Sequence, residues 1–362
     1  MKILYVITSS DVGGAENALA SLVRVVKARH TVKIICLKPL ECVAKQLIEE
    51  GVDVVSLNMQ GSGLGIVSKL VREIEIFKPD IVHAMLFRAI EFSRLACAGR
   101  SVKLITTPHF DLSQKPLWMR WLDCILKNID TVSTAESVST YNYLTGPQHY
   151  KKSKTLFIGN SVEKSKFFRD ASIKKTMRQT HHFMEEDIIF ISTARLAPVK
   201  NPLGLLSSFS KILSSCPHAK LIYVGEGGER AKLEQQIKAL NLEKQVFVVG
   251  EQKNINDWLN MADVFVLFSM EESLPLALLE AQQVGLPCLV SNVGDMPRQI
   301  IHGKNGFVCK TGDVLLLACM LTELYENKSM REKMGSYSLQ KTATIIDSSQ
   351  QYQQLYQQIM GK

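Results

Sequence analysis

The feature that most constrains this chain is a regular alternation between short apolar segments and longer segments in which apolar residues recur with a helical spacing. Apolar runs of about four to eight residues are typical of buried strands, and apolar residues three or four apart are typical of amphipathic helices. Strands and helices that alternate in this way form parallel sheets covered by helices on both faces. In the first part of the chain we expect strands at residues 2–8, 31–37, 52–57, 81–84, 103–107, 131–134 and 155–158, and helices at 15–29, 41–50, 66–77, 88–98, 117–127 and 136–144.

A polar and charged stretch, residues 161–185, interrupts this alternation, and the pattern then starts again. The tail, residues 345–360, keeps a helical spacing of apolar residues. The sequence therefore predicts an α/β protein with two doubly wound, Rossmann-like domains that face a cleft, at residues 1–165 and 166–344. For the second series we expect strands at residues 187–193, 220–224, 246–249, 264–268, 287–291 and 306–308, and helices at 202–215, 229–240, 255–260, 276–284 and 313–327.

The composition is that of a soluble globular protein, and 362 residues suit two domains. No apolar run approaches the ~20 residues that span a bilayer. The apolar start of the chain reads as a first strand rather than a signal peptide. The eight cysteines are scattered without the spacing of a metal site, so we expect reduced, mostly buried thiols in a cytoplasmic protein and no bound metal.

The net charge of +8 is concentrated in the first part of the chain. Residues 1–160 contain 20 Lys and Arg against 14 Asp and Glu, a net charge of +6. This excess favours an anionic partner, such as a phospholipid surface, a diphosphate-linked substrate or a nucleic acid. A solvated basic face without a partner is an equally good interpretation of the charge alone.

Residues 269–285 carry the most informative motif. They follow an apolar strand and open a helix, with Pro275 in the first turn and Gly285 after the last. Two carboxylates, Glu272 and Glu280, lie seven residues apart. Ligands of open α/β sheets bind at the carboxyl ends of strands, and a helix start offers N–H groups to phosphate. The segment therefore predicts a site for a phosphorylated, hydroxyl-rich ligand, with ordinary solvated glutamates as the alternative.

A second motif places Arg195 and Lys200 in the loop after the first strand of the second domain. A guanidinium can bind two phosphate oxygens at once, and an ammonium adds a point charge. Fixed cations would stabilise a departing diphosphate. The glycine-rich run 225–228 also follows a strand, and its glycines would permit a tight turn and close approach of a ligand, but it lacks the full dinucleotide-binding pattern.

Glycines and histidines supply further candidates. Gly14, in the first strand-to-helix loop, would let a ligand approach closely, and Gly250 would line a base pocket through its backbone. His83 and His109 both end predicted strands of the first domain, and His109 is the better candidate because Pro108 restrains its loop. No obvious pair of acid and base carboxylates is found in either half.

Taken together, these residues resemble the family 4 retaining glycosyltransferases, which have the GT-B fold. The similarity spans most of the chain and follows the family's order of motifs. The matching pieces are Gly13-Gly14-Ala15-Glu16, Pro79-Asp80-Ile81-Val82-His83, Pro108-His109, Asn160, Arg195 with Lys200, Gly225-Glu226-Gly227, and Glu272 through Glu280.

The resemblance implies a role for each matching residue. Arg195 and Lys200 would bind the donor diphosphate, while Glu280 would bind the ribose hydroxyls and Glu272 the sugar hydroxyls. The backbone of Leu274, Pro275 and Leu276 would contact phosphate or sugar. Gly14 would approach the diphosphate from the opposite domain, and His109 would lie near the transferred sugar. The last helix, about residues 345–362, would pack back on the first domain.

Several positions depart from the family pattern. Glycine is usual where this chain has Ala194, Asn201 and Ser273, and two later positions, Asp295 and Arg298, also differ. The predicted diphosphate-binding residues are retained. The departures therefore bear on which sugar is transferred rather than on the class of reaction.

The resemblance implies transfer of a hexose from a nucleoside diphosphate sugar, most often a UDP-sugar, with retained configuration and without a metal or another cofactor. The acceptor would be a glycan or a lipid-linked molecule in the synthesis of a surface polysaccharide or glycoconjugate. The first domain would bind the acceptor and the second the nucleotide sugar. The alternatives are a nucleotide-sugar epimerase and a non-enzymatic protein that binds anionic surfaces. We expect no nucleic-acid partner, because no long basic run with clustered aromatics is found.

Residues 115–121 mix bulky apolar and basic side chains, including Trp118 and Trp121. Similar regions of relatives touch the bilayer. We therefore expect a cytoplasmic protein with peripheral contact to the inner face of the cytoplasmic membrane. The alternative is that one or both tryptophans belong to the core.

Overall fold

The computed structural model describes residues 1–11, 13–61, 63, 65–109 and 116–361. The chain forms two compact units, Met1–Asn160 with Ile346–Lys362, and Ser161–Ile345. The division lies five residues before the predicted boundary at 165, because the segment after Asn160 packs on the second unit. There the backbone N–H of Phe168 donates to the Asn256 side chain at 3.0 Å, and Phe167 contacts the second unit's core.

The first unit contains one parallel sheet. Among the described residues, seven parallel strands pair in the order β3-β2-β1-β4-β5-β6-β7. Successive strands are therefore added on one side of β1 up to β3 and on its other side from β4 onward, so the strand order reverses between β1 and β4. All of these strands were predicted to within a few residues. Their bounds are β1 (Lys2–Ile7), β2 (Thr31–Cys36), β3 (Asp53–Ser56), β4 (Ile81–Met85), β5 (Lys103–Thr107), β6 (Val132–Ala135) and β7 (Thr155–Phe157).

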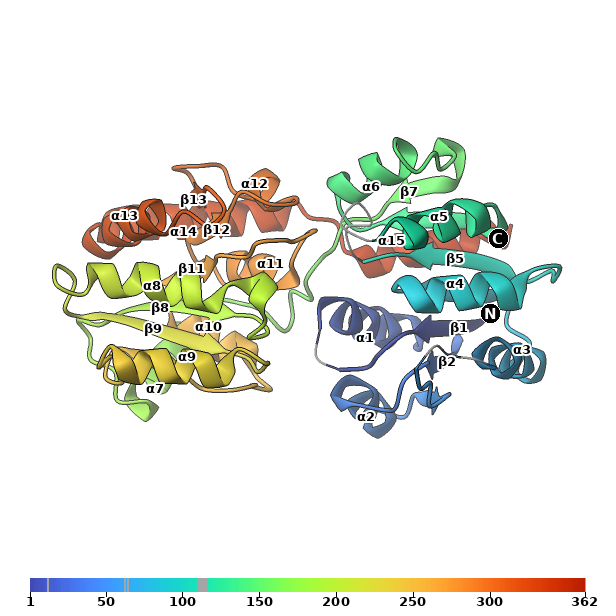
Figure 1. Cartoon of the computed structure of the whole chain (residues 1–362), viewed down its shortest axis with the longest axis horizontal. Coiled ribbons are helices and arrows are strands. Elements are labelled where there is room, and N and C mark those ends of the chain that lie inside the picture. The colour runs from blue at the N-terminus through green and yellow to red at the C-terminus, as the bar shows by residue number, and fades with distance from the viewer. Residues whose placement is uncertain (12, 62, 64, 110–115, 362) are drawn as a thin grey trace. The chain divides into compact units, whose positions relative to one another are not determined.

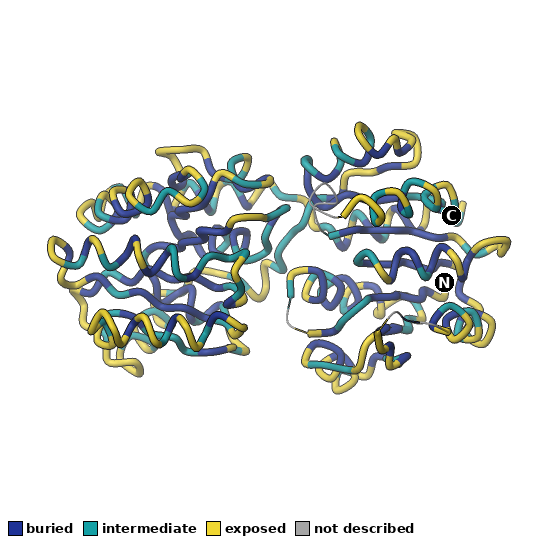
Figure 2. Tube along the Cα trace, viewed as in Figure 1, coloured by how far each residue is buried: buried dark blue, intermediate teal, exposed yellow. Residues whose placement is uncertain are grey.

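Helices lie on both faces of this sheet (Figure 1), and its central strands are buried (Figure 2). Alternate residues of β1 point to opposite faces, so that Ile3 and Tyr5 join one core cluster while Leu4 and Val6 join another. The first cluster is covered by α1 (Gly14–Val26), α2 (Cys42–Glu49) and α15 (Ser348–Ile359). The second is covered by α3 (Ile66–Phe77) and α4 (Phe87–Cys97); α5 (Leu117–Leu126) and α6 (Val138–Thr145) complete the unit.

Helix α15 is fastened to the first unit by buried polar groups as well as by apolar ones. His83, within β4, forms hydrogen bonds through its two ring nitrogens to the Tyr356 hydroxyl at 2.7 Å and to Thr107 Oγ1 at 2.8 Å. Burial lowers the pKa of His83 to about 3, so its ring is neutral. His83 therefore connects the sheet to the last helix and is enclosed by it, which explains its position in the motif without a role in chemistry.

The second unit repeats the same architecture. Its described strands pair in parallel in the order β10-β9-β8-β11-β12-β13, with the reversal between β8 and β11. The strands are β8 (Ile188–Thr193), β9 (Ala219–Val224), β10 (Val246–Val248), β11 (Val264–Leu267), β12 (Cys288–Ser291) and β13 (Gly306–Cys309). The helices are α7 (Ala171–Thr180), α8 (Pro202–Ile212), α9 (Arg230–Ala239), α10 (Ile255–Met261), α11 (Leu276–Gln283), α12 (Met296–Gln299), α13 (Val314–Glu326) and α14 (Lys328–Ala343).

Three of these helices, α7, α12 and α14, were not predicted. Helix α7 has no buried residue, and α14 buries mainly small or polar side chains, so neither shows an apolar period. In α14, a Cβ atom on Gly335 would lie 2.3 Å from the Gly285 carbonyl, which shows how closely this helix packs on the turn after α11. Asp170 caps α7 by accepting from the backbone N–H of Ser172 at 2.7 Å, a signal that an N-cap search would have found.

Candidate functional site

The candidate site lies at the carboxyl edge of the second sheet, where the strand order reverses between β8 and β11. This reversal is where open α/β sheets bind ligands, because neighbouring loops there turn to opposite faces. The loop after β8 carries Arg195 and Lys200, and the loop after β11 carries Glu272. The backbone N–H of Met270 donates to the Val199 carbonyl at 2.7 Å, which joins the two loops.

Two predicted site residues from these loops form an ion pair. Lys200 Nζ lies 2.5 Å from Glu272 Oε1, and the Glu272 side chain is only 8% exposed. Ser269, which is fully buried, donates from Oγ to the same carboxylate oxygen at 2.8 Å. Ser269 was not predicted as a site residue, and its place at the end of β11, three residues before the glutamate, was the available signal. The pair gives the site a fixed ammonium and a fixed carboxylate.

Arg195 differs from Lys200 because its guanidinium is exposed and forms no ion pair or hydrogen bond with any described residue. Nearby, α11 begins with backbone N–H groups that also have no acceptor in the described chain, those of Leu276 and Ala277. Pro275 precedes them without an N–H, and Leu274 is buried in the loop. Of the predicted contact residues 274–276, only Leu276 therefore presents an amide without an acceptor among the described residues. Ala277, which was not predicted, presents a second, and two such amides suit an anion.

Glu280 lies in α11, one turn beyond those amides. Burial raises the pKa of Glu280 to about 7, although part of the side chain remains exposed. No described residue donates a hydrogen bond to its carboxylate. A partly desolvated carboxylate without a partner is costly, and hydroxyl donors from a ligand would relieve that cost.

The predicted glycines of the second unit have structural roles that the sequence did not reveal. A Cβ atom would lie 2.1 Å from the Ala194 carbonyl if added to Gly225, and 2.3 Å from the Leu196 carbonyl if added to Gly227. These glycines therefore let the loop after β9 pack on the loop that carries Arg195. Gly250 accepts from the Gly225 N–H at 2.8 Å and has φ +74°, so its backbone continues the same loop packing.

A further glycine supports Glu272 and was missed by the sequence analysis. Gly294, in the loop after β12, has φ +54°, and an added Cβ would lie 2.3 Å from the carbonyl of Glu272. The next residue, Asp295, donates its backbone N–H to the Ser273 carbonyl at 2.8 Å. The loops after β8, β11 and β12 are thus joined by backbone contacts, which fix the Lys200–Glu272 pair.

In the first unit, Gly14 and His109 both lie at the carboxyl edge of the sheet. Gly14 is exposed as the first residue of α1, and a Cβ added to it would meet no atom within 4 Å, so packing alone does not require a glycine. His109 follows β5 with φ +54°, and its Nε2 is buried without a partner among the described residues. Burial lowers the pKa of His109 to about 4, so the ring is neutral at pH 7.

Helix α5 decides the open question about the two tryptophans. Trp118 is 61% exposed and Trp121 is 69% exposed, so the interpretation of either as a core residue is wrong. Leu117 and Ile125 are also exposed and lie on the same side of the helix. We call these four side chains the apolar ridge of α5. Among the described residues, no helix is both long and apolar enough to cross a membrane.

The fold alone places the protein in a structural class. The Anabaena protein HepE, solved with UDP-glucose, matches all of this chain and all of its own with a TM-score of 0.88 at 21% identity. WaaG, described as a glycosyltransferase of lipopolysaccharide biosynthesis, matches both chains over their full length with a TM-score of 0.81 at 12% identity. The two Rossmann-like units therefore form the GT-B fold, as expected.

The sequence narrows the class to a family. The family model described as Glycosyltransferase Family 4 matches residues 12–165, and the model described as Glycosyl transferases group 1 matches residues 173–341. The chain belongs to the family 4 glycosyltransferases, and its motif resemblance is thereby confirmed. It is a transferase, so the alternatives of an epimerase and a non-enzymatic binder are not retained.

Curated relatives differ in how much of the chain they match. N-acetyl-alpha-D-glucosaminyl L-malate synthase of Bacillus anthracis is 27% identical over 310 residues, which cover 82% of this chain and 79% of that protein. The Escherichia coli UDP-Gal:alpha-D-GlcNAc-diphosphoundecaprenol alpha-1,3-galactosyltransferase is 31% identical over 160 residues, which cover 43% of this chain and 41% of that protein. This chain thus spans less than half the length of the second relative.

Proposed function

We propose that this glycosyltransferase moves a hexose from a UDP-sugar to a glycan or lipid-linked acceptor, with retention of configuration, during synthesis of a surface polysaccharide or glycoconjugate. The observation that carries the proposal is the group of charges at the strand reversal of the second sheet: the Lys200–Glu272 pair, and Arg195 and Glu280, neither of which has a partner in the described part of the chain. The UDP-glucose complex of HepE and the UDP-Gal donor named for the Escherichia coli relative support the choice of nucleotide.

Each group of this site suits one part of a nucleotide sugar. Arg195, Lys200 and the free amides at the start of α11 are donors for the two phosphates. The carboxylate of Glu280 accepts from ribose hydroxyls, and the second oxygen of Glu272 is available to sugar hydroxyls. Because two protein cations neutralise the diphosphate, we propose that transfer needs neither a metal nor another cofactor.

The reaction breaks the bond between the anomeric carbon and the diphosphate oxygen and forms a bond from the acceptor oxygen to the same carbon, on the same face. The acceptor proton passes to the departing diphosphate oxygen, so no protein base is needed. Arg195 and Lys200 stabilise the charge that collects on the diphosphate as it leaves. We assign His109, with its neutral ring and unpartnered Nε2, to hydrogen bonding with the transferred sugar, and Gly14 to close approach of the diphosphate.

We further propose that the first unit binds the acceptor and touches the inner face of the cytoplasmic membrane through the apolar ridge of α5. Exposed indole rings are favoured at the bilayer interface. The segment after α6, which contacts α5 at Gln148, continues directly into three exposed lysines, Lys151, Lys152 and Lys154. Exposed apolar and basic groups in this part of the first unit suit a surface of anionic lipids.

Nucleotide binding tests the donor assignment. We expect UDP to raise the unfolding temperature more than GDP or ADP, since a ligand at 100 times its Kd stabilises a protein by about 2.7 kcal/mol. The Arg195→Ala and Glu280→Ala variants should lose most of that increase. If UDP stabilises both variants as it does the native protein, the site assignment is wrong.

Vesicle sedimentation tests the membrane assignment independently. We expect the protein to pellet with vesicles containing phosphatidylglycerol and to remain in solution with phosphatidylcholine alone. Trp118→Ser with Trp121→Ser should abolish pelleting. Leu315→Ser is the matched control, because Leu315 is an exposed apolar residue of α13 in the second unit. Equal pelleting by the native protein and the double variant would contradict the assignment.

A further inference from the structure

Helix α5 is attached to the first unit on the side of Asp123, where Met119, Leu122 and Leu126 are half-buried. Asp123 is the one buried residue among the described residues of the helix. Arg120, on the same side, stacks on the Tyr143 ring at 5.7 Å, and Lys127, which directly follows the helix, lies over the Tyr150 ring at 5.3 Å. The apolar ridge faces away from these contacts, and only Trp118 meets a ring of the unit, that of Phe87 at 6.2 Å, among the described contacts. An ordinary surface helix buries such large apolar side chains instead of exposing four of them.

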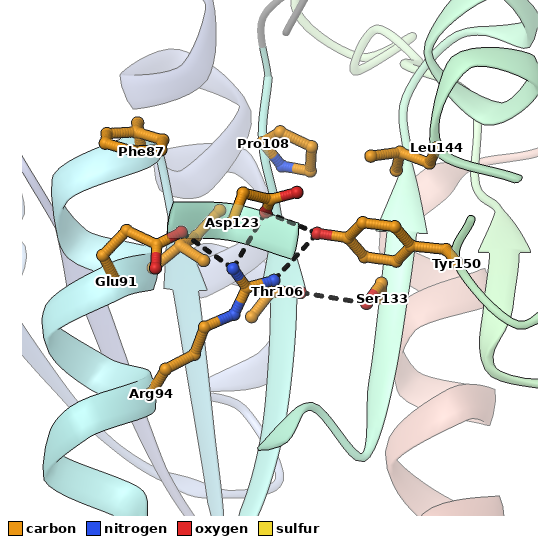
Figure 3. A pocket seen from close by; sticks show the side chains of 10 residues that line it. Phe87, Glu91, Arg94, Thr106, Pro108, Asp123, Ser133, Leu144 and Tyr150 are labelled. Carbon is orange, nitrogen blue, oxygen red and sulfur yellow. Dashed lines mark hydrogen bonds and ion pairs between the residues drawn. The ribbon is translucent and has the colours of Figure 1, made fainter. Parts of the chain in front are cut away.

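The anchor of α5 is a buried cluster of charges centred on Arg94 of α4, drawn in Figure 3. Arg94, 1% exposed, donates to Glu91 Oε1 and to Asp123 Oδ1, each at 2.8 Å. Its guanidinium also binds Asp130 through two nitrogens, at 2.8 and 2.6 Å. Tyr150 accepts from Arg94 at 2.8 Å and donates to Asp123 at 2.6 Å.

Asp123 is thereby held by three donors from outside its own helix. Arg94 and Tyr150 donate to Oδ1, and Gln148 Nε2 donates to Oδ2 at 2.9 Å. These donors belong to α4 and to the segment after α6, so the carboxylate fixes α5 against two elements at once. A cavity of about 10 Å³ beside the cluster has room for one water molecule.

We propose that Asp123 is a positioning residue that holds α5 with its apolar ridge turned outward, and that the Arg94 cluster opposes the tendency of that ridge to turn inward. This inference rests on the proposed membrane contact for its purpose. Rolling the helix would bury the ridge but would leave Arg94, Tyr150 and Gln148 without their acceptor. Arg94 would keep Asp130 and Glu91, but three buried hydrogen bonds to the Asp123 carboxylate would be lost, and buried donors left without an acceptor are costly, so the observed orientation is maintained.

Limited proteolysis with trypsin tests the anchor without reference to lipid. The bonds after Arg120 and Lys127 face the anchored side and should be cleaved slowly in the native protein. In Asp123→Ala we expect cleavage at these two sites to be at least about tenfold faster, because cleavage follows local opening. Asp123→Asn, which keeps an acceptor oxygen, should be cleaved at a rate between those of the native protein and Asp123→Ala. If the alanine variant does not fold, the cleavage rate of Asp123→Asn decides whether Asp123 holds α5.

The matched control is Asp263→Asn in the second unit, since Asp263 also binds an arginine and a lysine, Arg178 at 2.5 Å and Lys174 at 2.7 Å. This control should leave the two α5 sites protected. Unchanged protection of α5 in the Asp123 variants would overturn the proposal. So would equal opening of α5 in the control.

Vesicle sedimentation of the same variants separates the anchor from the membrane contact. If the native protein pellets with phosphatidylglycerol vesicles, Asp123→Ala should bind them at least about threefold more weakly, because its ridge is no longer held outward. Binding equal to that of the native protein would overturn the positioning role. If the native protein does not pellet, the membrane proposal fails, while the trypsin result still decides whether Asp123 holds α5.

Discussion

Two regions of this protein contain clusters of charged side chains, and they differ in whether those charges have partners within the protein. At the strand reversal of the second sheet, Arg195 and Glu280 have no partner among the described residues. In the first unit, Arg94 is buried and its guanidinium is bound by three carboxylates. Both regions contain a glutamate whose pKa burial raises to about 7, Glu280 in one and Glu91 in the other.

The comparison shows that a raised pKa does not by itself mark a binding site. Glu91 Oε1 is held by Arg94 and the residue is closed off from solvent, so its perturbed pKa follows from the assembly of the domain. Glu280 reaches solvent beside a helix start with free amides. Charges satisfied within the protein maintain the fold, whereas charges left unsatisfied at a strand edge are available to a ligand.

The largest expected effect is a loss of stability when Arg94 is replaced by methionine, compared with the same replacement of Arg195. Arg94→Met leaves three buried carboxylates without their counter-charge and should lower the free energy of unfolding by about 3–5 kcal/mol. Arg195→Met removes an exposed group that no described residue binds, and it should change the free energy of unfolding by less than about 0.5 kcal/mol. Urea unfolding followed by circular dichroism measures both. Equal destabilisation by the two changes would break the distinction between satisfied and available charges.

A smaller effect, on turnover rather than stability, is expected for Lys200→Ala. Removing one fixed charge that stabilises a leaving group costs about 10²-fold, or ~3 kcal/mol of the barrier. The control is Lys211→Ala, an exposed lysine of α8 in the same unit. UDP release from UDP-glucose would be compared for both variants. Turnover within about twofold of the native rate in Lys200→Ala would remove Lys200 from the site.

The sequence was sufficient to predict the parts of the molecule whose structure follows from a local pattern of residues. Apolar runs located every described strand, because a buried parallel strand is apolar on both faces. Motif positions also led to Lys200 and Glu272, since loops at one sheet edge converge. Their direct contact at 2.5 Å, and its support by Ser269, depend on how three loops pack and have no local signature.

The sequence was insufficient where function or packing reverses a usual pattern. Helix α5 has an ordinary amphipathic spacing, and only its three-dimensional contacts show that the apolar side faces outward. Helix α14 lacks an apolar period because its contact with the turn at Gly285 depends on a small residue, Gly335. Gly225 and Gly227 were interpreted as sites of ligand approach, yet what approaches them is the protein's own backbone.

A further prediction concerns the pH dependence of stability, through Glu91. Burial is the main reason that its folded pKa is about 7, above the ordinary value of 4.5, and Asp123 and Asp130 add to the increase while Arg94 opposes it. Between these two pH values Glu91 holds its proton more tightly in the folded protein than in the unfolded chain. The contribution of Glu91 to the free energy of unfolding is therefore greatest below pH 4.5 and is lost as the pH rises through 7.

Glu91→Gln should remove this contribution. From pH 5 to pH 8 the native protein should lose roughly 2 kcal/mol more of its unfolding free energy than the variant, as measured by urea unfolding at each pH. The adjacent Tyr150 keeps its proton throughout, because burial raises its pKa well above its ordinary value. Parallel pH profiles for the two proteins would show that Glu91 does not titrate in this range.

The smallest expected effect is the change with pH of the affinity for UDP-glucose, through the ionisation of Glu280. With a pKa of about 7 in the free protein, this carboxyl is largely protonated at pH 6 and ionised at pH 8. Ribose hydroxyls donate more strongly to the ionised form, so affinity for UDP-glucose should rise by up to about tenfold over this range. UDP-glucose is the appropriate probe because its diphosphate does not titrate there. Calorimetric titration of Glu280→Gln should give an affinity nearly independent of pH, and an unchanged pH dependence in that variant would place the titrating group elsewhere.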